Sequence, residues 1–266
     1  MVKDAFGSLL KQHRKSKRFS QLDLATEADI SSRHLSFLET GRSAPSRDMV
    51  LHLARVLGCT FKDANVMLSA AGFAQVYRQR TLDDPDMKEA KEALQLLLDC
   101  HEPYPAVVID NHWNLLMANH TQQKLVALLI ENGAVFPASI NLLDHFFAPH
   151  GYREFVDDWQ SFAVYLLQRV EKEMILQGEM EQAKILIDRL QSYPDVPKNW
   201  RQQTPQFENS PMIRLTLKVG EQRISLFSTI AVFGTPLDVT LQSLRIEHYF
   251  PADEMSKSFF HQFSKE

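Results

Sequence analysis

The segment FSQLDLATEADISSRHLSFLETGRSAPS, residues 19–46, contains two short helical patterns joined by a tight turn. Ser20 and Ser31 each precede an apolar pattern at helical spacing, so we expect both to be N-caps. Gly41 follows the second pattern and supplies the left-handed residue at which many helices end. Two short helices with such a turn are typical of a helix-turn-helix. The segment therefore predicts a helix-turn-helix unit.

Three further helical patterns flank this unit. An apolar repeat over residues 6–13 predicts one helix before it. After it, Ser46 and Thr60 are the expected N-caps of two more helices, which end at Gly58 and Gly72. We therefore expect an all-α region of five helices at the start of the chain.

One face of the second helix in the unit has no obvious packing partner. Leu35 and Leu38 lie where they would face the first helix. The remaining face consists of Ser32, Arg33, Ser36 and Phe37. A phenylalanine beside an arginine and two hydroxyls is an unusual solvent-exposed face, so we expect it to meet a partner.

Charge is distributed unevenly along the 266 residues. Residues 1–80 carry 13 Lys and Arg against 7 Asp and Glu, a net charge of +6, whereas the remainder carries 16 against 26, a net charge of −10. A basic head on an acidic body suggests that the head alone meets a polyanion. The sequence shows no apolar run long enough to cross a bilayer and no leader pattern, and only Cys59 and Cys100 are present, so we expect a cytoplasmic protein without a disulfide framework.

Beyond the head, the pattern changes from purely helical to mixed. We expect a linker and connecting helix over residues 77–100, so that the head spans residues 1–76 and the body residues 101–266. The body should open with strands at 106–109 and 113–117, followed by a helix capped by Asn119. Helical patterns at 141–147, 153–176 and 179–190 come next, then strands at 213–219 and 223–233 and a final helix or strand. The expected fold class is therefore an all-α head joined to an α+β body.

The head resembles the Cro/phage-repressor type of helix-turn-helix, also called XRE-like. The likeness is carried by SQLDLA, ISSRHLSFLETGR and LHLARVLG, and it covers residues 3 to about 72. It implies a lambda-repressor-like head that binds double-stranded DNA with its third helix in the major groove. It also implies an Arg14–Glu39 pair between the first and third helices. The DNA-binding residues that it implies are Gln21, Ser31, Ser32, Arg33, Ser36, Phe37, Thr40, Arg42 and Arg47. Ser32, Arg33 and Phe37 would meet bases, with Ser36 nearby, and Gln21, Thr40, Arg42 and Arg47 would meet phosphates.

The body resembles the MmyB-like ligand-binding domain of bacterial transcription regulators. The likeness is carried by HEPYPAVVIDNHWNLLMAN, INLLDHFFAP and FSTIAVFGTPLDVTLQSLRIEHYFPAD, over roughly residues 101–252. It implies a PAS-like fold with an apolar cavity for a fatty acid or related lipid. We expect the ligand-binding residues to be Trp113, Met117, Asn119, Phe146, Phe147, Trp159, Phe162, Arg214, Phe227 and Phe233. Asn119, Arg214 and His145 are alternative anchors for a ligand carboxylate.

The chain shows no pattern typical of catalysis. It has no nucleophile elbow, no metal-ligand spacing among its 10 histidines and no phosphate-binding glycine loop. We therefore do not expect an enzyme, a metal or a cofactor. The two resemblances imply a homodimeric transcription regulator that does not enter membranes. Two alternatives keep the same head. In one, the body is a ligand-free interaction module, and in the other it cleaves its own chain at Ala71-Gly72.

Overall fold

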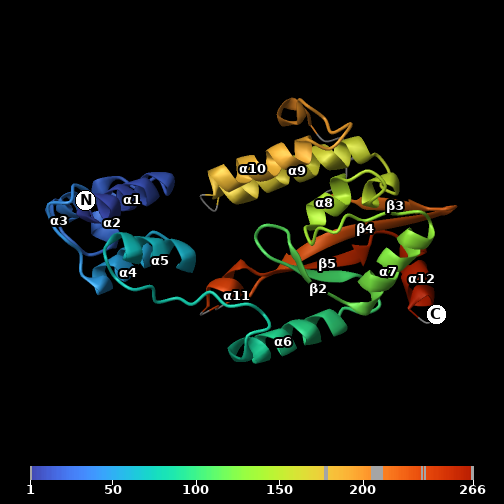
Figure 1. Ribbon diagram of the computed structural model, residues 1–266, viewed down its shortest axis with the longest axis horizontal. Helices are drawn as coiled ribbons and strands as arrows, with labels where there is room; N and C mark the ends of the chain where they lie inside the picture. The colour runs from blue at the N-terminus through green and yellow to red at the C-terminus, as the bar shows by residue number, and fades with distance from the viewer. Residues whose placement is uncertain (1, 177–178, 205–211, 235, 237, 265–266) are drawn as a thin grey trace. The chain divides into compact units, whose positions relative to one another are not determined.

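The computed structural model describes residues 2–176, 179–204, 212–234, 236 and 238–264 (Figure 1). By its internal contacts the chain divides into two units. The first consists of residues 1–87 and 233–243, and the second of residues 88–232 and 244–266. Each has its own hydrophobic core. We call the first unit the head and the second the body.

Residues 2–87 of the head contain five α-helices, as the sequence predicts. These are α1 (Val2–Ser16), α2 (Gln21–Glu27), α3 (Ser32–Glu39), α4 (Arg47–Val56) and α5 (Phe61–Ala70). The side chains of Ser20, Ser31, Ser46 and Thr60 each accept a hydrogen bond from a backbone N–H in the first turn of the helix that follows. Gly41, Gly58 and Gly72 follow α3, α4 and α5 with φ of 70°, 58° and 85°. Local chemistry therefore determines where these helices begin and end.

The first and third helices of the head pack closely. A Cβ added to Gly7 of α1 would lie 2.6 Å from the carbonyl oxygen of Glu39 and 2.7 Å from that of Leu38. Only glycine fits this approach, because real Cβ atoms do not come so near to backbone. The helices enclose a core that includes Phe6, Leu35 and Leu53, all fully buried.

The body is built around an antiparallel sheet. Among the described residues its strands are β1 (Ala106–Ile109), β2 (Leu115–Ala118), β3 (Leu215–Val219), β4 (Gln222–Ala231) and β5 (Arg245–Pro251). Their order is β2-β1-β5-β4-β3, which places the last strand in the centre, beside the first. Val107 pairs with Glu247 in the β1–β5 register, and Ser228 pairs with Tyr249 in the β4–β5 register.

Helices lie on both sides of this sheet (Figure 1). The body helices are α6 (Lys88–Asp99), α7 (His120–Glu131), α8 (Leu142–Phe147), α9 (Trp159–Leu176), α10 (Met180–Gln191) and α12 (Glu254–Phe263), with short 3-10 turns at Pro85–Met87, Tyr152–Glu154 and Trp200–Gln202. In Figure 1, α8, α9 and α10 lie over one face and α6 lies on the other side. The expected all-α head joined to an α+β body is therefore confirmed.

Three details of the body differ from the sequence expectation. The helix expected over residues 153–176 begins only at Trp159, because Asp158 has φ of 49° and a 3-10 turn precedes it. The second strand begins at Leu115 rather than 113, since Trp113 has φ of 67°. The last segment is neither one helix nor one strand: α11 (Val239–Ser243), β5 and α12 follow one another.

The connection between β4 and β5 belongs to the head. Asp238 accepts a hydrogen bond from the Arg80 guanidinium at 3.1 Å, and Thr240 exchanges hydrogen bonds with the Arg80 backbone. The Oε1 atom of Gln242 accepts from the Phe61 N–H at 2.7 Å, which satisfies a free donor at the start of α5. Two strands of the body are thus covalently continuous with a segment held by the head.

Candidate DNA-binding face and ligand cavity

The exposed face of α3 begins with its N-terminal turn. Ser32 and Arg33 are exposed at this turn. Ser31 has a structural role as well, because its hydroxyl accepts from the His34 N–H at 3.1 Å. The positive end of the helix dipole and an exposed guanidinium therefore occur together at the start of α3.

Phe37 is half-buried rather than fully exposed. The Cζ atom of Arg33 lies 5.3 Å from the centre of its ring, and that of Arg42 lies 5.9 Å from it. Both distances are within the range of cation–π contacts. The ring therefore stabilises, by cation–π contact, two of the arginines expected to meet DNA. Ser36, the preceding residue on α3, is also half-buried.

The other residues expected at DNA lie at the edges of this face. Thr40, Arg42 and Arg47 are exposed. The Thr40 hydroxyl donates to the Ser36 carbonyl at 2.7 Å. Gln21, at the start of α2, is half-buried and its Nε2 atom donates to Glu39 at 2.7 Å. Gln21 is thus held in a fixed orientation by the predicted Arg14–Glu39 pair, which the structure contains.

A cavity of about 260 Å³ lies in the body, between α9 and the sheet. Its apolar walls include Trp113, Phe146, Phe162, Leu166, Leu215, Leu226 and Phe227. A smaller cavity of about 20 Å³, lined by Val107 and Leu125 among others, shares Phe146, Leu215, Leu226 and Tyr249 with it. The larger cavity approaches the lower end of the usual ligand-pocket range of roughly 300–1,000 Å³.

The same cavity has a charged end. The Arg169 Nη1 atom of α9 lies 3.1 Å from Oε1 of Glu247 on β5, and Ser228 donates to that oxygen at 3.0 Å. The Arg169 Nε atom donates to Glu173 at 2.9 Å, and Arg245 contacts the second Glu173 oxygen at 2.5 Å. Two guanidinium groups and two carboxylates thus form one chain of ion pairs, of which Arg169 and Glu247 line the cavity.

The ion pairs keep Arg169 and Glu173 charged despite their burial. Burial alone would lower the pKa of Arg169, but the carboxylates of Glu247 and Glu173 hold it above its ordinary value. Burial would likewise raise the pKa of Glu173, yet Arg169 and Arg245 hold it below its ordinary value. Burial, the nearby Glu247 carboxylate and a side-chain hydrogen bond to it raise the pKa of Tyr249, so its phenol is neutral.

Three buried polar atoms at this end have no hydrogen-bond partner among the described residues. They are Nη2 of Arg169, Oε2 of Glu247 and Nε1 of Trp113. The guanidinium of Arg169 also lies over the Trp113 ring, with its Cζ atom 4.5 Å from the ring centre. Unpaired buried donors and acceptors are costly, so a polar atom placed within hydrogen-bond distance of these three atoms would stabilise the group.

Of the expected ligand residues, the cavity brings together Trp113, Phe146, Phe162 and Phe227. Phe147 and Trp159 pack against each other in the core, with ring centres 5.2 Å apart. Met117 is half-buried on β2, Arg214 is exposed just before β3, and Phe233 belongs to the head unit.

The expected carboxylate anchors have other partners. Asn119 is buried as the N-cap of α7, and its oxygen also accepts from the Ala106 N–H. His145 is hydrogen-bonded to the Ser139 carbonyl at 2.6 Å. Neither these two nor Arg214 is among the described residues that line the cavity.

Sequence reasoning missed the charged end of the cavity. Arg169, Ser228, Glu247 and Tyr249 were not expected there. A signal exists in RIEHYF, where strand alternation puts Arg245, Glu247 and Tyr249 on one face. When such a strand lies in the centre of a sheet, the two charges and the phenol on one of its faces indicate a buried polar group.

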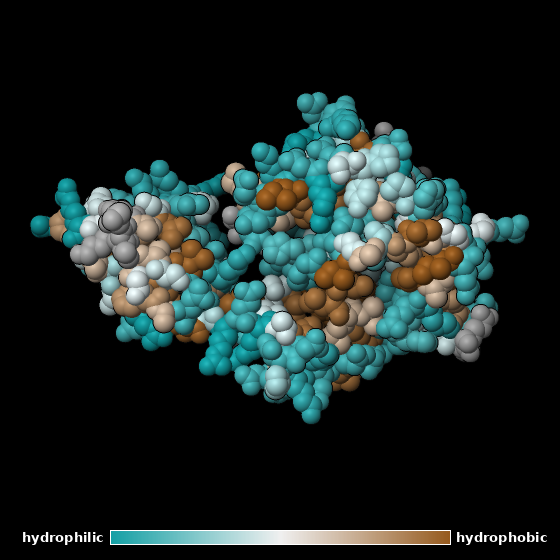
Figure 2. All heavy atoms as spheres, viewed as in Figure 1, coloured by the Kyte–Doolittle hydropathy of each residue, from teal (hydrophilic) through white to brown (hydrophobic). Residues whose placement is uncertain are grey.

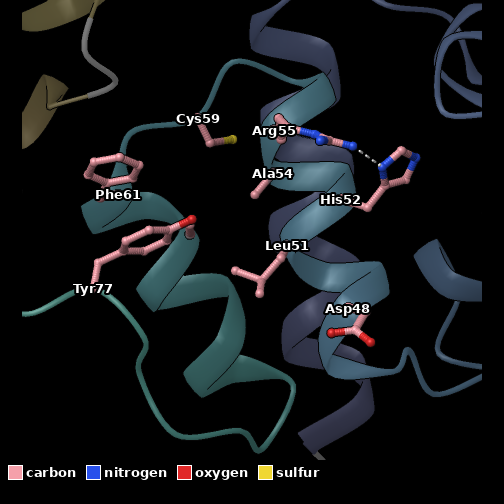
Figure 3. A pocket seen from close by; sticks show the side chains of 9 residues that line it. Asp48, Leu51, His52, Ala54, Arg55, Cys59, Phe61 and Tyr77 are labelled. Carbon is pink, nitrogen blue, oxygen red and sulfur yellow. Dashed lines mark hydrogen bonds between the residues drawn. The ribbon is translucent and has the colours of Figure 1, made fainter. Parts of the chain in front are cut away.

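A second cavity of about 500 Å³ lies in the head, between α4 and α5 (Figure 3). The rings of Phe61 and Tyr77 stack along one side with centres 4.1 Å apart, and Arg55 bonds to His52 on another. Burial raises the pKa of the Cys59 thiol to about 12, so this sulfur stays protonated. The cavity is open and has no buried unpaired polar atom among its described walls.

The described residues contain neither a helix suited to span a membrane nor a cluster suited to bind a metal. No helix there is long and apolar enough to cross a membrane. No group of three or more His, Cys, Asp or Glu within the same part of the chain has the geometry to hold a metal ion.

Comparison with protein families assigns both units. The model of the MmyB-like transcription regulator ligand binding domain matches residues 90–262. The chain belongs to the MmyB-like transcription regulators. A helix-turn-helix family model matches residues 10–63, so this MmyB-like regulator binds DNA through its head and a ligand through its body. Both are families of transcription regulators rather than enzymes.

Curated proteins and solved structures provide no further basis for assigning the chain. No curated protein matches the MmyB-like regulator. Among solved structures it is similar to an RNA-binding light-oxygen-voltage receptor, with 11% sequence identity and a TM-score of 0.26 over 98% of this chain. It spans 63% of the length of that receptor. So loose a likeness supports no statement on fold or function.

Proposed function

We propose that this MmyB-like regulator binds an apolar small molecule, a fatty acid or related lipid, in the 260 Å³ body cavity, and that the ligand changes its affinity for operator DNA. The observation that carries this proposal is the composition of the cavity. Aromatic and aliphatic walls end at a buried group with unpaired polar atoms, which is the arrangement of a site for an amphipathic ligand.

The proposed operator contacts divide into two kinds. Arg33, with Ser32, Ser36 and the Phe37 ring, meets base edges in the major groove, because these residues share the exposed face of α3. Gln21, Ser31, Thr40, Arg42 and Arg47 lie at the ends of this face, where their side chains or helix N-termini suit phosphate contacts. Readout of sequence should then depend on Arg33, and overall affinity on the others.

We propose that the β4–β5 connection transmits the ligand state. Ser228 on β4 and Glu247 on β5 line the cavity. The segment between these strands is held in the head by Asp238, Thr240 and Gln242. A ligand that alters the spacing of the two strands therefore changes the strain on the contacts of α11 with the head, and so shifts the population of DNA-competent forms.

The proposed assembly is a cytoplasmic homodimer on double-stranded DNA. Helix-turn-helix dimers read two half-sites about one helical turn apart, so a ligand that changes how two heads are held changes affinity. Exposed apolar residues of the body, such as Leu96, Leu176 and Ile185, are available for self-association. On the face in Figure 2, hydrophobic residues gather in separate patches with hydrophilic residues between them. Light scattering of the full chain tests the dimer directly.

Two other functions keep the DNA-binding head but fit the body less well. A ligand-free interaction module would fill its interior with its own side chains, whereas this body has a partly open cavity with unpaired polar atoms. A self-cleaving body would need an all-β fold, whereas this one packs α8, α9 and α10 over its sheet. Gly72, the second residue of the candidate cleavage site, follows α5 with φ of 85°, so its role in ending the helix already accounts for a glycine at this position.

The experiment that tests the ligand is extraction of the purified full chain with organic solvent, followed by mass spectrometry. A Leu226→Trp variant, whose larger side chain fills both cavities, is the matched control. We expect close to one lipid molecule per chain in the extract of the natural protein and much less in the extract of the variant. A clean extract from both, with no thermal stabilisation by added lipids, would favour the interaction module.

A further inference from the structure

The polar end of the body cavity is balanced in charge before any ligand arrives. Arg169 pairs with Glu247 and Glu173, and Arg245 pairs with Glu173, so two positive groups meet two negative ones. Glu247 is 2% exposed, and its carboxylate forms part of the cavity wall. A ligand that brought a further negative charge would lie beside this carboxylate without a spare cation to offset it.

The unpaired atoms at this end are of both kinds. By distance and angle, Nη2 of Arg169 and Nε1 of Trp113 have no acceptor and Oε2 of Glu247 has no donor, although the Tyr165 and Tyr249 phenols interact with the Arg169 and Glu247 side chains. Ser228 already donates to the other Glu247 oxygen. An ionised carboxylate offers only acceptors, so it would leave Oε2 of Glu247 unpaired and repelled. A hydroxyl or primary amide offers a donor to Glu247 and an acceptor to Arg169 or Trp113 at once.

We propose that the cavity selects lipids with a neutral head group that both donates and accepts hydrogen bonds, namely long-chain alcohols or primary amides, over ionised fatty acids. This proposal rests on the proposed function, because it assumes that the cavity is the ligand site, and it narrows the proposed fatty acid or related lipid to lipids with a neutral head group. Glu247 is then the residue that determines head-group specificity. Arg169 binds the acceptor atom of the ligand and is held by Glu173 on the same helix.

The test uses delipidated full chain and three probes of equal chain length: 1-decanol, decanamide and decanoate. Carboxylic acids titrate at about pH 4 to 5, so decanoate is ionised at neutral pH. Dissociation constants are measured by calorimetry at one neutral pH. We expect the alcohol and the amide to bind at least about tenfold more tightly than decanoate, since burying an uncompensated charge is costly.

The variant Glu247→Gln removes the negative charge and leaves a net positive cluster. The preference for 1-decanol over decanoate should then fall by about tenfold or reverse. Without the Glu247 charge, the Arg169 cation can pair with the carboxylate of decanoate. Glu171→Gln on the same helix removes an equal charge outside the cluster, where Glu171 pairs with Arg201, and should leave the preference unchanged. The readout is a ratio of two ligands on one protein, so a change in stability alone does not alter it.

The possible results separate the two proposals. Tighter binding of decanoate than of 1-decanol and decanamide by the natural protein would overturn the head-group proposal and leave lipid sensing intact. Equal preference in the natural protein and the Glu247→Gln variant would overturn the role of Glu247. Failure of all three probes to bind would overturn the proposed lipid-sensing function itself.

Discussion

Arg14 of α1 and Glu39 of α3 form a buried bidentate ion pair, with Nε 2.5 Å from Oε1 and Nη2 3.0 Å from Oε2. Gln21 of α2 donates to the same carboxylate at 2.7 Å, and Arg14 also donates to the Phe19 carbonyl at 2.9 Å. The pair therefore joins three helices of the head. It fixes α3, the helix that presents Arg33, against the rest of the head.

Breaking this pair from one side should destabilise the head strongly. We expect Arg14→Met to lower the free energy of unfolding by about 3–5 kcal/mol, because it leaves the Glu39 carboxylate buried and uncompensated. The double variant Arg14→Met with Glu39→Leu should recover much of this loss. Urea unfolding of both variants measures the difference, and equal losses would contradict a coupled pair.

The same pair predicts a pH dependence. Burial would raise the pKa of Glu39, but its hydrogen bonds from Arg14 and Gln21 outweigh that effect and hold the pKa below its ordinary value. A carboxyl with a lowered folded-state pKa stabilises the fold above its unfolded pKa of about 4.3, and this contribution disappears as the pH falls further. The stability difference between the natural protein and Glu39→Gln should therefore shrink below about pH 4. A difference that stays constant down to pH 2 would argue against this linkage.

Arg33 and Arg42 should affect DNA binding in different ways. Arg33→Ala should cost roughly 1–3 kcal/mol at one base position and relax the preference there. Arg42→Gln should weaken binding to all sequences alike and reduce the salt slope by about one unit. Binding measured against a panel of single-base operator variants distinguishes the two effects. A uniform loss for both variants would refute the assignment of Arg33 to base readout.

The contacts of the β4–β5 connection should be needed for the ligand response rather than for binding itself. Asp238→Ala removes the 3.1 Å contact with Arg80 and should leave operator and lipid binding within about threefold of normal while abolishing the effect of one on the other. Glu221→Gln, in the exposed hairpin between β3 and β4, is the matched control. Retention of full coupling in Asp238→Ala would show that the signal takes another route.

The sequence predicted the head more fully than the body because its determinants are local. Ser20, Ser31 and Thr60 act within one turn of their own helices, and the glycines act at single positions. The strand order of the body depends on pairings such as Val107 with Glu247, which join residues far apart in the chain. Short-range patterns contain no signal for such pairings.

Only the apolar walls of the body cavity were expected from the sequence, for a similar reason. Trp113, Phe146, Phe162 and Phe227 could be proposed from their type, and they lie together in the cavity. In the sequence Arg169 and Glu173 look like an ordinary i,i+4 pair on a helix surface. Only the central position of β5 brings Glu247 to Arg169 and buries both ends of the ion pair.

The most direct test of a ligand-controlled operator switch is the operator dissociation constant of the full chain in three states: as purified, after delipidation, and after reloading with its own extract. Operator sequences are first selected from random DNA with the same protein. We predict that delipidation changes the constant by about 5-fold or more and that reloading restores it, since allosteric coupling is typically 1–3 kcal/mol. Identical constants in all three states, with a lipid shown to be lost and regained, would contradict the account.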